Sequence, residues 1–565
     1  MAQTNLHGEA HAHPSPFSRL MGWMGAERTD IWVVVIYSVA IGLLSLVVPI
    51  ATQSLVNTIA FGTLQQPLLV LALLVLLGLG CAAVLKVLRS HVVEVMQRRI
   101  FVRVSADSIE RLLRVRIKAY DDDHGPELVN RFFEVVTLQK GGASLLVEGL
   151  EVLMTTLIGM ILLAVYHPVL LIFAIIILFS VFVVIFPLGY GAVNTAIKES
   201  KAKYALAAWL QELARHPSTF KSLPGATFAL TRSNEMVADY VKYRRAHWRV
   251  LMRQIIGSQA MQAFGTAAVL GAGGWLVMER QLTLGQLIAA ELVVAASLGS
   301  FSKFGKQLET YYDLLAAVDK LGYLTDLPTE SSGDEPIAAG KGASIELRQV
   351  SFGHHAGHPL LHDISLMIPA GSRFGITGDV AAGKSSLIDL IYGFREPNTG
   401  TLLFDQSDYR NLKLYDLRGH IALVRGIEIF HGTIEDNIRL GVKDISSADL
   451  RQILETVDLL ETVETLPDGL QTMLTTGGQP LTPGQSYRLM LARALALNPR
   501  VLILDEILDR MEDGPGQDAL MKRLISSENA WTLIVVSRSQ SVLKNCLHTV
   551  TLEHGQIKGQ RNHEA

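Results

Sequence analysis

A long stretch without formal charge lies near the start of the chain. From Ile31 to Leu85 there is no Asp, Glu, Lys or Arg. A helix that crosses a bilayer needs roughly 20 apolar residues, so this stretch is long enough for two such helices. Gly, Pro and polar residues cluster at 61–67 and mark the break between them. Buried helices of a large soluble protein are the alternative, and a charge-free stretch of this length argues against them.

Two later regions repeat the pattern. The stretch 152–197 is also free of charge and is interrupted at 166–168 by Tyr-His-Pro. A third apolar region covers 254–278 and 284–302, which are separated by the short polar segment 279–283. We therefore expect roughly six membrane-spanning helices in three hairpins. The composition agrees, because 49% of the residues are hydrophobic and only 18% are charged.

Charge is concentrated between the hairpins, in the segments 86–151 and 198–253. Loops rich in Lys and Arg stay on the cytoplasmic side of a membrane. An even number of spans then places both ends of the chain on that side. We expect the charged segments to continue the spans as helices beyond the bilayer. The basic residues of the first segment include Lys86, Arg89, Arg98, Arg99, Arg103, Arg111, Arg114 and Arg116.

Glu291 falls inside the last predicted span. A charge at the middle of a membrane costs ~2.5–3.5 kcal/mol on insertion scales, so such a residue is expected to face a cavity or a partner. Glu291 is therefore a candidate substrate contact. The alternatives are that it lies near the membrane edge or is protonated.

Shifts in composition divide the chain into four parts. We predict a polar N-terminal lead over 1–29, a transmembrane domain over 30–323, a linker over 324–343 and a soluble α/β domain over 344–565. The lead is interpreted as a disordered tail rather than a metal site, although it carries His7, His11 and His13. The net charge of −3 gives no bulk attraction to nucleic acid, and no nucleic-acid partner is expected.

The α/β part contains a phosphate-binding motif. Residues 378–385 read G-x-x-x-x-G-K-S between a strand-like run and a helical run. The glycines let backbone N–H groups face a phosphate, and the helix N-terminus favours its charge. Lys384 would reach the outer phosphates and Ser385 would ligate Mg²⁺; a chance match is the alternative. The predicted ATP contacts here are Gly378, Asp379, Val380, Ala381, Ala382, Gly383, Lys384, Ser385 and Ser386.

A second acidic motif ends the apolar run 501–504. Asp505 and Glu506 follow it, which places two carboxylates at the carboxyl end of a buried strand, beside the nucleotide. Asp505 would hold Mg²⁺ directly or through water, and Glu506 would act as general base on the attacking water. A strand that ends in acids by chance is the alternative, and the upstream loop weakens it.

Between these motifs the chain resembles the ATP-binding cassette transporter family. Residues 481–485, Leu-Thr-Pro-Gly-Gln, are similar to the Leu-Ser-Gly-Gly-Gln signature, and Leu-Ala-Arg-Ala-Leu follows at 491–495. The stretches 432–438, 466–470 and 282–287 resemble exporters of the family. The likeness covers about residues 30 to 560. It implies an all-α six-helix transmembrane domain followed by an α/β P-loop ATPase domain.

The resemblance further implies a half-transporter that works as a dimer. Each ATP would lie between the phosphate loop of one subunit and the signature of the other. The signature contacts implied in this way are Leu481, Thr482, Pro483, Gly484 and Gln485.

Several positions depart from the family pattern. Arg425 stands where a Gln contacts Mg²⁺ and water, and a fixed cation cannot ligate Mg²⁺. Arg538 stands where a switch His follows a strand; Arg can bind a γ-phosphate but cannot share a proton in the same way. Pro483 lacks an N–H that would face phosphate. His354 aligns with the aromatic residue that stacks on adenine, and Ala381 replaces a Gly.

Two hypotheses follow. The first is an ATP-driven exporter of an amphipathic or hydrophobic substrate, in the bacterial inner membrane with its ATPase domain and both termini cytoplasmic. The second is a weakly hydrolysing subunit of a heterodimer, or an ATP-gated regulatory membrane protein. The loop side and the signature side are both altered in this chain, which favours a homodimer. A soluble DNA-repair cassette ATPase is excluded by the predicted spans.

Overall fold

The chain divides into two compact units. The first comprises residues up to 115 together with 120–328, and the second comprises 116–119 and 329–565. The histidines of the N-terminal lead, His7, His11 and His13, lie outside the residues that the structure describes. The computed structural model describes 15–61, 65–122, 129–302, 304–354, 358–442, 444–511, 515–526 and 529–562.

The first unit is all helical. Within the described residues, six helical stretches are long and apolar enough to cross a bilayer, which confirms the six-helix prediction. They are formed by α2 (Arg28–Ser45) with α3 (Val47–Phe61), α4 (Gln65–Arg114), α7 (Glu134–Ser144) with α8 (Leu150–Tyr166), α9 (Pro168–Ile185), α12 (Leu223–Met278), and α13 (Leu284–Ser302) with α14 (Phe304–Thr325). Shorter or more polar helices are α1 (Pro16–Ala26), α5 (Ala119–Asp122), α10 (Ala192–Arg215) and α11 (Pro217–Phe220).

Proline sets two of the breaks between these helices. His167 is extended, and Pro168 begins α9, where the missing N–H of proline leaves no intrahelical bond unmade. Between α9 and α10, Pro187 interrupts the helix and Gly191 adopts a φ of 84°. Gln254 of α12 supplies a hydrogen-bond donor at this break, because its Nε2 donates to the carbonyl oxygen of Val184 at 3.2 Å.

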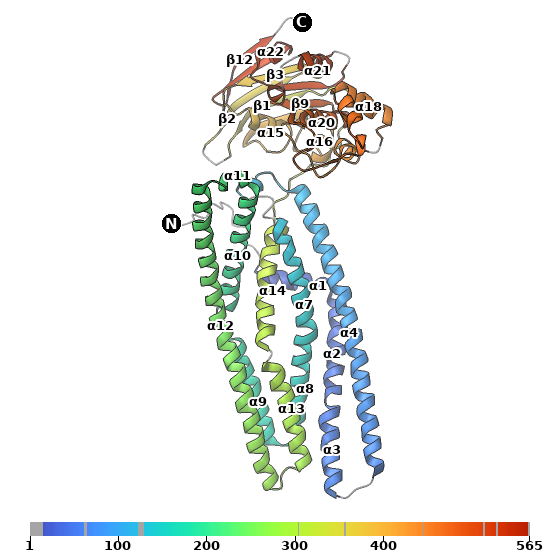
Figure 1. Ribbon diagram of the computed structural model, residues 1–565, viewed down its shortest axis with the longest axis vertical. Helices are drawn as coiled ribbons and strands as arrows, with labels where there is room; N and C mark the ends of the chain where they lie inside the picture. The colour runs from blue at the N-terminus through green and yellow to red at the C-terminus, as the bar shows by residue number, and fades with distance from the viewer. Residues whose placement is uncertain are drawn as a thin grey trace. The chain divides into compact units, whose positions relative to one another are not determined.

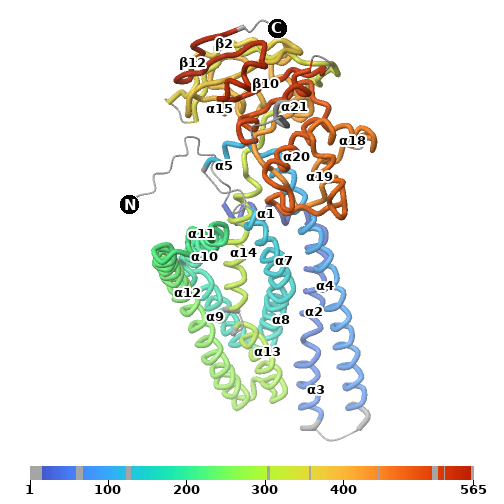
Figure 2. The backbone as a smooth tube through the Cα atoms, turned by 45° about the horizontal axis from the view of Figure 1, so that its top comes forward, coloured from blue at the N-terminus to red at the C-terminus, as the bar shows by residue number. Residues whose placement is uncertain are grey.

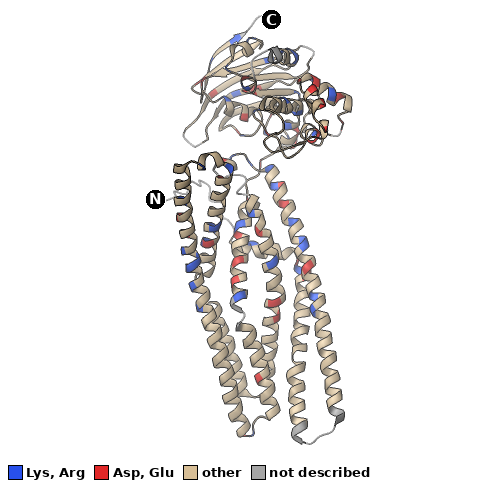
Figure 3. Cartoon of the chain, viewed as in Figure 1, with Lys and Arg blue, Asp and Glu red and all other residues tan. Residues whose placement is uncertain are grey.

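The longest helices extend well beyond a hydrocarbon layer. Helix α4 has 50 residues and α12 has 56. At 1.5 Å per residue they are about 75 and 84 Å long, whereas the apolar core of a bilayer is about 30 Å thick. In Figure 3 the Lys, Arg, Asp and Glu residues of both helices lie mostly along one half, and the other half is nearly free of them. The apolar halves are the parts that fit a membrane.

The long helices lie side by side, as Figure 1 shows, and α8 and α13 connect the two sides of the unit. Helix α12 packs against α9, α10 and α13, α2 packs against α4 and α8, and α13 also packs against α3 and α8. One apolar core lies among α8, α9, α12 and α13 and includes the fully buried residues Leu163, Leu276 and Leu298. Arg89 of α4 is also buried, and its Nη2 donates to Glu151 of α8 at 2.6 Å, which pairs a charge among apolar neighbours.

The second unit is an α/β domain with two main sheets. A four-stranded antiparallel sheet has the order β2-β1-β4-β5, and a six-stranded sheet has the order β12-β11-β3-β10-β9-β6. The first sheet contains β1 (Ile345–Phe352), β2 (Leu361–Ile368), β4 (Thr399–Phe404) and β5 (Ser407–Asp408). The second contains β3 (Arg373–Gly378), β6 (Ile421–Val424), β9 (Val501–Asp505), β10 (Thr532–Val536), β11 (His548–Glu553) and β12 (Gln556–Asn562).

Helices and a short hairpin complete this unit, and Figure 2 shows α18, α19 and α20 gathered together at one side of it. The hairpin pairs β7 (Gly432–Thr433) with β8 (Met473–Leu474). The helices are α15 (Lys384–Ile391), α16 (Leu414–His420), α17 (Ile434–Arg439), α18 (Ser447–Thr456), α19 (Leu460–Thr465), α20 (Pro483–Ala496), α21 (Pro515–Ile525) and α22 (Gln540–Leu543).

Five neighbouring strands of the larger sheet run parallel. Strand β3 pairs with β11 and β10, β10 also pairs with β9, and β9 pairs with β6, all in parallel register. Strands β9 and β10 are buried throughout, as expected for a parallel sheet with both faces covered. The carboxyl ends of these strands therefore lie at one edge, which is where ligands bind in open α/β sheets.

The segment before the α/β domain lies along the surface of the second unit. Glu330 accepts two hydrogen bonds from Arg418 of α16, each 2.7 Å long. Glu335 forms an isolated bridge with Leu412. Residues from 329 onward thus belong to this unit, whereas 324–328 belong to the helical unit.

Candidate functional site

The phosphate loop joins β3 to α15. Gly378 has a φ of 152° and Gly383 a φ of 98°, which are conformations that glycine adopts without strain. Ala381 has a φ of 62° and so holds a left-handed conformation that disfavours a side chain by roughly 1–2 kcal/mol. The loop thus keeps its shape although one usual glycine is replaced.

The side chain of Lys384 reaches back across the phosphate loop that precedes it. Its Nζ donates to the carbonyl oxygens of Gly378 and Asp379 at 2.8 and 2.9 Å, and its side chain is 5% exposed. At the start of the same helix, the hydroxyl of Ser386 lies 3.5 Å from Nε2 of His354. The structure therefore brings the predicted adenine-side residue His354 next to the loop, at the end of β1.

Asp505 is paired with Arg425. Asp505 ends β9, and Arg425 follows the neighbouring strand β6, so the parallel register places them side by side. The Nε of Arg425 donates to Oδ2 of Asp505 at 2.6 Å, and its Nη2 donates to the carbonyl oxygen of Ser385 at 3.1 Å. Burial raises the pKa of Asp505, the positive charge of Arg425 opposes that change, and the charge of Glu506 adds to it.

Glu506 lies between two other cations. Its Oε1 is 3.7 Å from Nζ of Lys384 and 3.5 Å from Nη2 of Arg538. Arg538 comes from the end of β10, the strand between β3 and β9. Glu506 has a φ of 54°, a strained left-handed conformation. Each of the two arginines that depart from the family pattern therefore contacts one of the adjacent carboxylates, Arg425 that of Asp505 and Arg538 that of Glu506.

Two carboxylates of this site escaped the sequence analysis as site residues. Asp389 of α15 accepts from Nη1 of Arg425 at 2.7 Å and from Nε of Arg395 at 3.4 Å. Asp509 accepts from the backbone N–H of Arg538 at 3.0 Å and from the hydroxyl of Ser537. In the sequence, Asp389 is marked only by its position five residues after the loop lysine. Its partner Arg425 could not be recognised without the register of the sheet.

The predicted signature begins α20. Thr482 is the N-cap: its Oγ1 accepts from the backbone N–H of Gln485 at 3.3 Å, and Gln485 Oε1 accepts from the N–H of Thr482 at 2.9 Å. Pro483 is the first helical residue, where its missing N–H costs the helix nothing. Leu481 is buried and Gly484 is half-buried. The departure at Pro483 is therefore compatible with the helix.

The loop and the signature share no polar contact in the part of the chain that the structure describes, because no hydrogen bond or ion pair joins 481–485 to 378–386. Instead, Gln485 Nε2 donates to the hydroxyl of Thr462 of α19 at 3.3 Å. Arg493 holds the other side of α20, because its Nε and Nη2 donate to the backbone and side chain of Asn437 at 2.6 and 2.7 Å.

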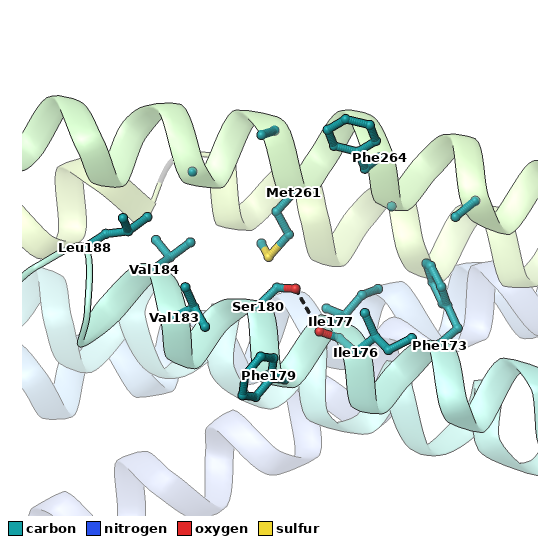
Figure 4. A pocket seen from close by; sticks show the side chains of 14 residues that line it. Phe173, Ile176, Ile177, Phe179, Ser180, Val183, Val184, Leu188, Met261 and Phe264 are labelled. Atoms are coloured by element: carbon teal, nitrogen blue, oxygen red, sulfur yellow. Dashed lines mark hydrogen bonds between the residues drawn. The ribbon is translucent and has the colours of Figure 1, made fainter.

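The helical unit contains a cavity of about 540 Å³ between α9 and α12. Figure 4 shows Met261 of α12 extending toward α9, where Ile177 and Val184 lie on the facing helix. Phe173 of α9 and Phe264 of α12 also line the cavity. Its lining is almost wholly apolar. The hydroxyl of Ser180 also lines it, but donates to the carbonyl oxygen of Ile176 at 2.8 Å.

The predicted substrate contact Glu291 is half-buried on α13 and is not among the residues that line this cavity. The structure therefore separates the one acidic candidate from the apolar cavity. The proposed role of Glu291 stays a prediction.

Comparison with known proteins identifies the family. Residues 31–300 match the family described as "ABC transporter transmembrane region", and residues 361–509 match the family described as "ABC transporter". The chain belongs to the ATP-binding cassette transporters. It combines the membrane and cassette parts of an exporter-type half-transporter in one polypeptide.

Known relatives are similar to different extents. An "ATP-dependent lipid A-core flippase" of Methylococcus capsulatus is 26% identical over 81% of this chain and 77% of that protein. The protein of that name from Chromobacterium violaceum is 31% identical over 54% of this chain and 53% of its own length. A "multidrug efflux ATP-binding/permease protein" of Mycobacterium tuberculosis is 30% identical over 58% of this chain and 27% of its own. The chain spans about half the length, or less, of most of the curated relatives it matches.

A solved structure has the same fold. The bacterial Atm1-family ABC exporter with ATP bound aligns with a TM-score of 0.84 and 19% identity, over 95% of this chain and 96% of that one. At this identity the likeness shows the fold alone. It confirms the predicted fold class, a six-helix transmembrane domain followed by a P-loop cassette.

Proposed function

We propose that two copies of this chain form an ATP-driven exporter. The observation that carries the proposal is the position of Glu506 at the end of β9, 3.7 Å from the loop lysine Lys384. A carboxylate beside the phosphate loop is suited to polarise an attacking water. Binding of ATP between the loop of one chain and the signature of the other would close the cassettes, and hydrolysis would reset them.

The proposed dimer is supported by the lack of polar contact between the two halves of the site within one chain. Lys384 lies on the loop, and the exposed N-terminus of α20 at Thr482 and Pro483 lies elsewhere on the same cassette. A second chain would bring its own α20 to the loop. We favour a homodimer, because both the loop side and the signature side carry departures, and a heterodimeric partner would be expected to repair only one of them.

The proposed substrate is amphipathic or hydrophobic. Its support is the cavity between α9 and α12, whose lining offers large apolar side chains such as Phe173 and Phe264. The similarity to proteins named as a lipid A-core flippase and as a multidrug efflux protein agrees with cargo of this class. Glu291 would then meet a polar or cationic group of the substrate.

The site as it lies does not fit Mg²⁺. The motif resemblance assigns the ion to the Ser385 hydroxyl and the Asp505 carboxylate, but a guanidinium nitrogen of Arg425 lies 2.6 Å from that carboxylate. Arg425 stands where the family has a neutral Gln that can ligate the metal, whereas a guanidinium has no acceptor atom.

A second candidate function is a subunit that binds ATP but hydrolyses it slowly. It is favoured by the pairing of both catalytic-type carboxylates with arginines, Asp505 with Arg425 and Glu506 with Arg538. A carboxylate held by a cation is a weaker base. The two candidates differ in the rate of turnover, and the following experiment separates them.

The test is ATP hydrolysis by the full-length chain in lipid vesicles, compared with the Lys384→Ala variant. Hydrolysis above that variant, stimulated by an apolar compound, supports the exporter. Binding of ATP without hydrolysis above the variant supports the slow subunit. A chain that is homodimeric and moves substrate alone would exclude an obligate heterodimer.

We propose an integral multi-pass protein of the bacterial inner membrane, with the cassette and both termini in the cytoplasm. The family and the apolar helices establish only that the protein spans a membrane. The basic residues of α4, such as Arg98, Arg99 and Arg103, support the orientation, because positive charge near a span favours the cytoplasmic side.

A further inference from the structure

Arg425 occupies the centre of the phosphate site rather than its edge. Its guanidinium makes three separate contacts, with Asp505 at 2.6 Å, Asp389 at 2.7 Å and the carbonyl oxygen of Ser385 at 3.1 Å. Asp505 is 4% exposed and Asp389 is 14% exposed, so both carboxylates are largely removed from water. The side chain of Arg425 is therefore held in place by two buried charges of opposite sign.

Each acid of the site has a cation among the side chains of the site itself. Asp389, Asp505 and Glu506 contact four cations: Arg425 contacts Asp389 and Asp505, Arg395 contacts Asp389, and Lys384 and Arg538 contact Glu506. In a cassette with Gln and His at 425 and 538, two of these cations would be absent. Asp505 would then lose its hydrogen-bonded cation, and the family resemblance implies Mg²⁺ in its place.

A divalent ion at Asp505 would have to displace Arg425. Displacement would break the charge-assisted hydrogen bond between Arg425 and Asp505. Asp389 would then be the one carboxylate of these two that still contacts the guanidinium. Bringing the ion next to a fixed cation also adds like-charge repulsion in a partly buried site. Arg425 is nevertheless 34% exposed, so part of its guanidinium is open to a ligand.

We propose that Arg425 is a resident cation that replaces the divalent ion in nucleotide binding. The ligand of this cassette is then a nucleoside triphosphate free of Mg²⁺, held by Lys384 and by the open part of the Arg425 guanidinium. Arginine suits this role, because its planar fork recognises phosphate and its charge is permanent. The inference rests on the proposed function, in which the loop 378–386 binds ATP.

The test measures the affinity of the full-length protein for a fluorescent ATP analogue, trinitrophenyl-ATP, in Mg²⁺ and in EDTA. For the unaltered chain, the dissociation constants in Mg²⁺ and in EDTA are expected to differ by less than about threefold, which corresponds to a small difference in binding free energy. In Arg425→Gln the neutral amide is restored, and affinity in EDTA is expected to fall about tenfold or more below affinity in Mg²⁺. Arg425→Lys keeps a cation and is expected to keep binding in EDTA.

Arg395→Gln is the matched control. Arg395, which follows α15, also contacts Asp389, at 3.4 Å. This variant is expected to bind equally with and without Mg²⁺. Midpoints of thermal unfolding show that each variant is folded.

The outcomes distinguish the inference from the proposed function. Binding by the unaltered chain in Mg²⁺ and loss of binding in EDTA would overturn the resident cation and leave the ATP site standing. Equal Mg²⁺ dependence of the unaltered chain and Arg425→Gln would also overturn it. Absence of binding in both conditions, with Lys384→Ala no different, would overturn the ATP site and the inference with it.

Discussion

Replacement of Asp389 by Asn is expected to destabilise the cassette selectively. The substitution keeps the shape of the side chain and removes the charge that accepts from Arg425 at 2.7 Å. Two unit charges about 4 Å apart interact by about 4 kcal/mol at an effective dielectric constant of about 20. Because Arg425 is one-third exposed and keeps Asp505, we reduce this to about 2 kcal/mol.

A loss of this size is measurable by thermal unfolding. For a domain of 150–250 residues, 1 kcal/mol shifts the midpoint by about 2–4 °C, so the expected decrease is about 4–8 °C. Trp531 is the one Trp of the segment 329–565, and it reports the cassette transition by fluorescence. The same scan on a Trp531→Phe variant identifies which transition belongs to the cassette.

The control is Glu346→Gln, which breaks the exposed ion pair with Arg348 on β1. An exposed pair contributes little, so no measurable shift is expected. The double variant Asp389→Asn with Arg425→Gln removes both charges and is expected to lose less than the sum of the single losses. The reasoning is refuted if Asp389→Asn behaves like Glu346→Gln, or if the two single losses simply add.

Three other predictions follow from the structure. Glu506→Gln should lower ATP hydrolysis in vesicles by ~10²–10⁴-fold and leave nucleotide binding measurable, because it removes only the proposed base; unchanged hydrolysis would exclude that role. Thr482→Val should lower the cassette midpoint through loss of about 1 kcal/mol of N-cap stabilisation, whereas Thr482→Ser should not. Burial raises the pKa of the Cys546 thiol from 9.0 to about 12, so the unfolded chain loses this proton first and stability falls as pH rises through that window. Cys546→Ala should show a smaller decrease in midpoint between pH values of about 8 and 10; an equal decrease would contradict the assignment.

The two arginine departures gain their meaning only from the structure. In the sequence, Arg425 and Arg538 are separate replacements at positions where the family has Gln and His. In the structure, each lies on one of the two acids that end β9. The two replacements therefore lie in one site and cannot be interpreted independently of each other.

The sequence by itself determined the class of the protein. Charge-free stretches such as 31–85 predict spans because insertion depends on local hydropathy, and the loop motif at 378–385 predicts a strand–loop–helix because its glycines and lysine act within a few residues. The six spans and the cassette fold are confirmed. The roles of the individual site residues stay predictions.

The tertiary structure alone decided which side chains meet. Arg425, Asp505 and Arg538 are far apart along the chain, and they converge because β6, β9 and β10 are neighbours in parallel register with their carboxyl ends at one edge. Asp389 joins them because α15 starts at that same edge. Strand order and register are long-range properties that no local pattern encodes, so the pairing of charges at this site could not be read before the fold was known.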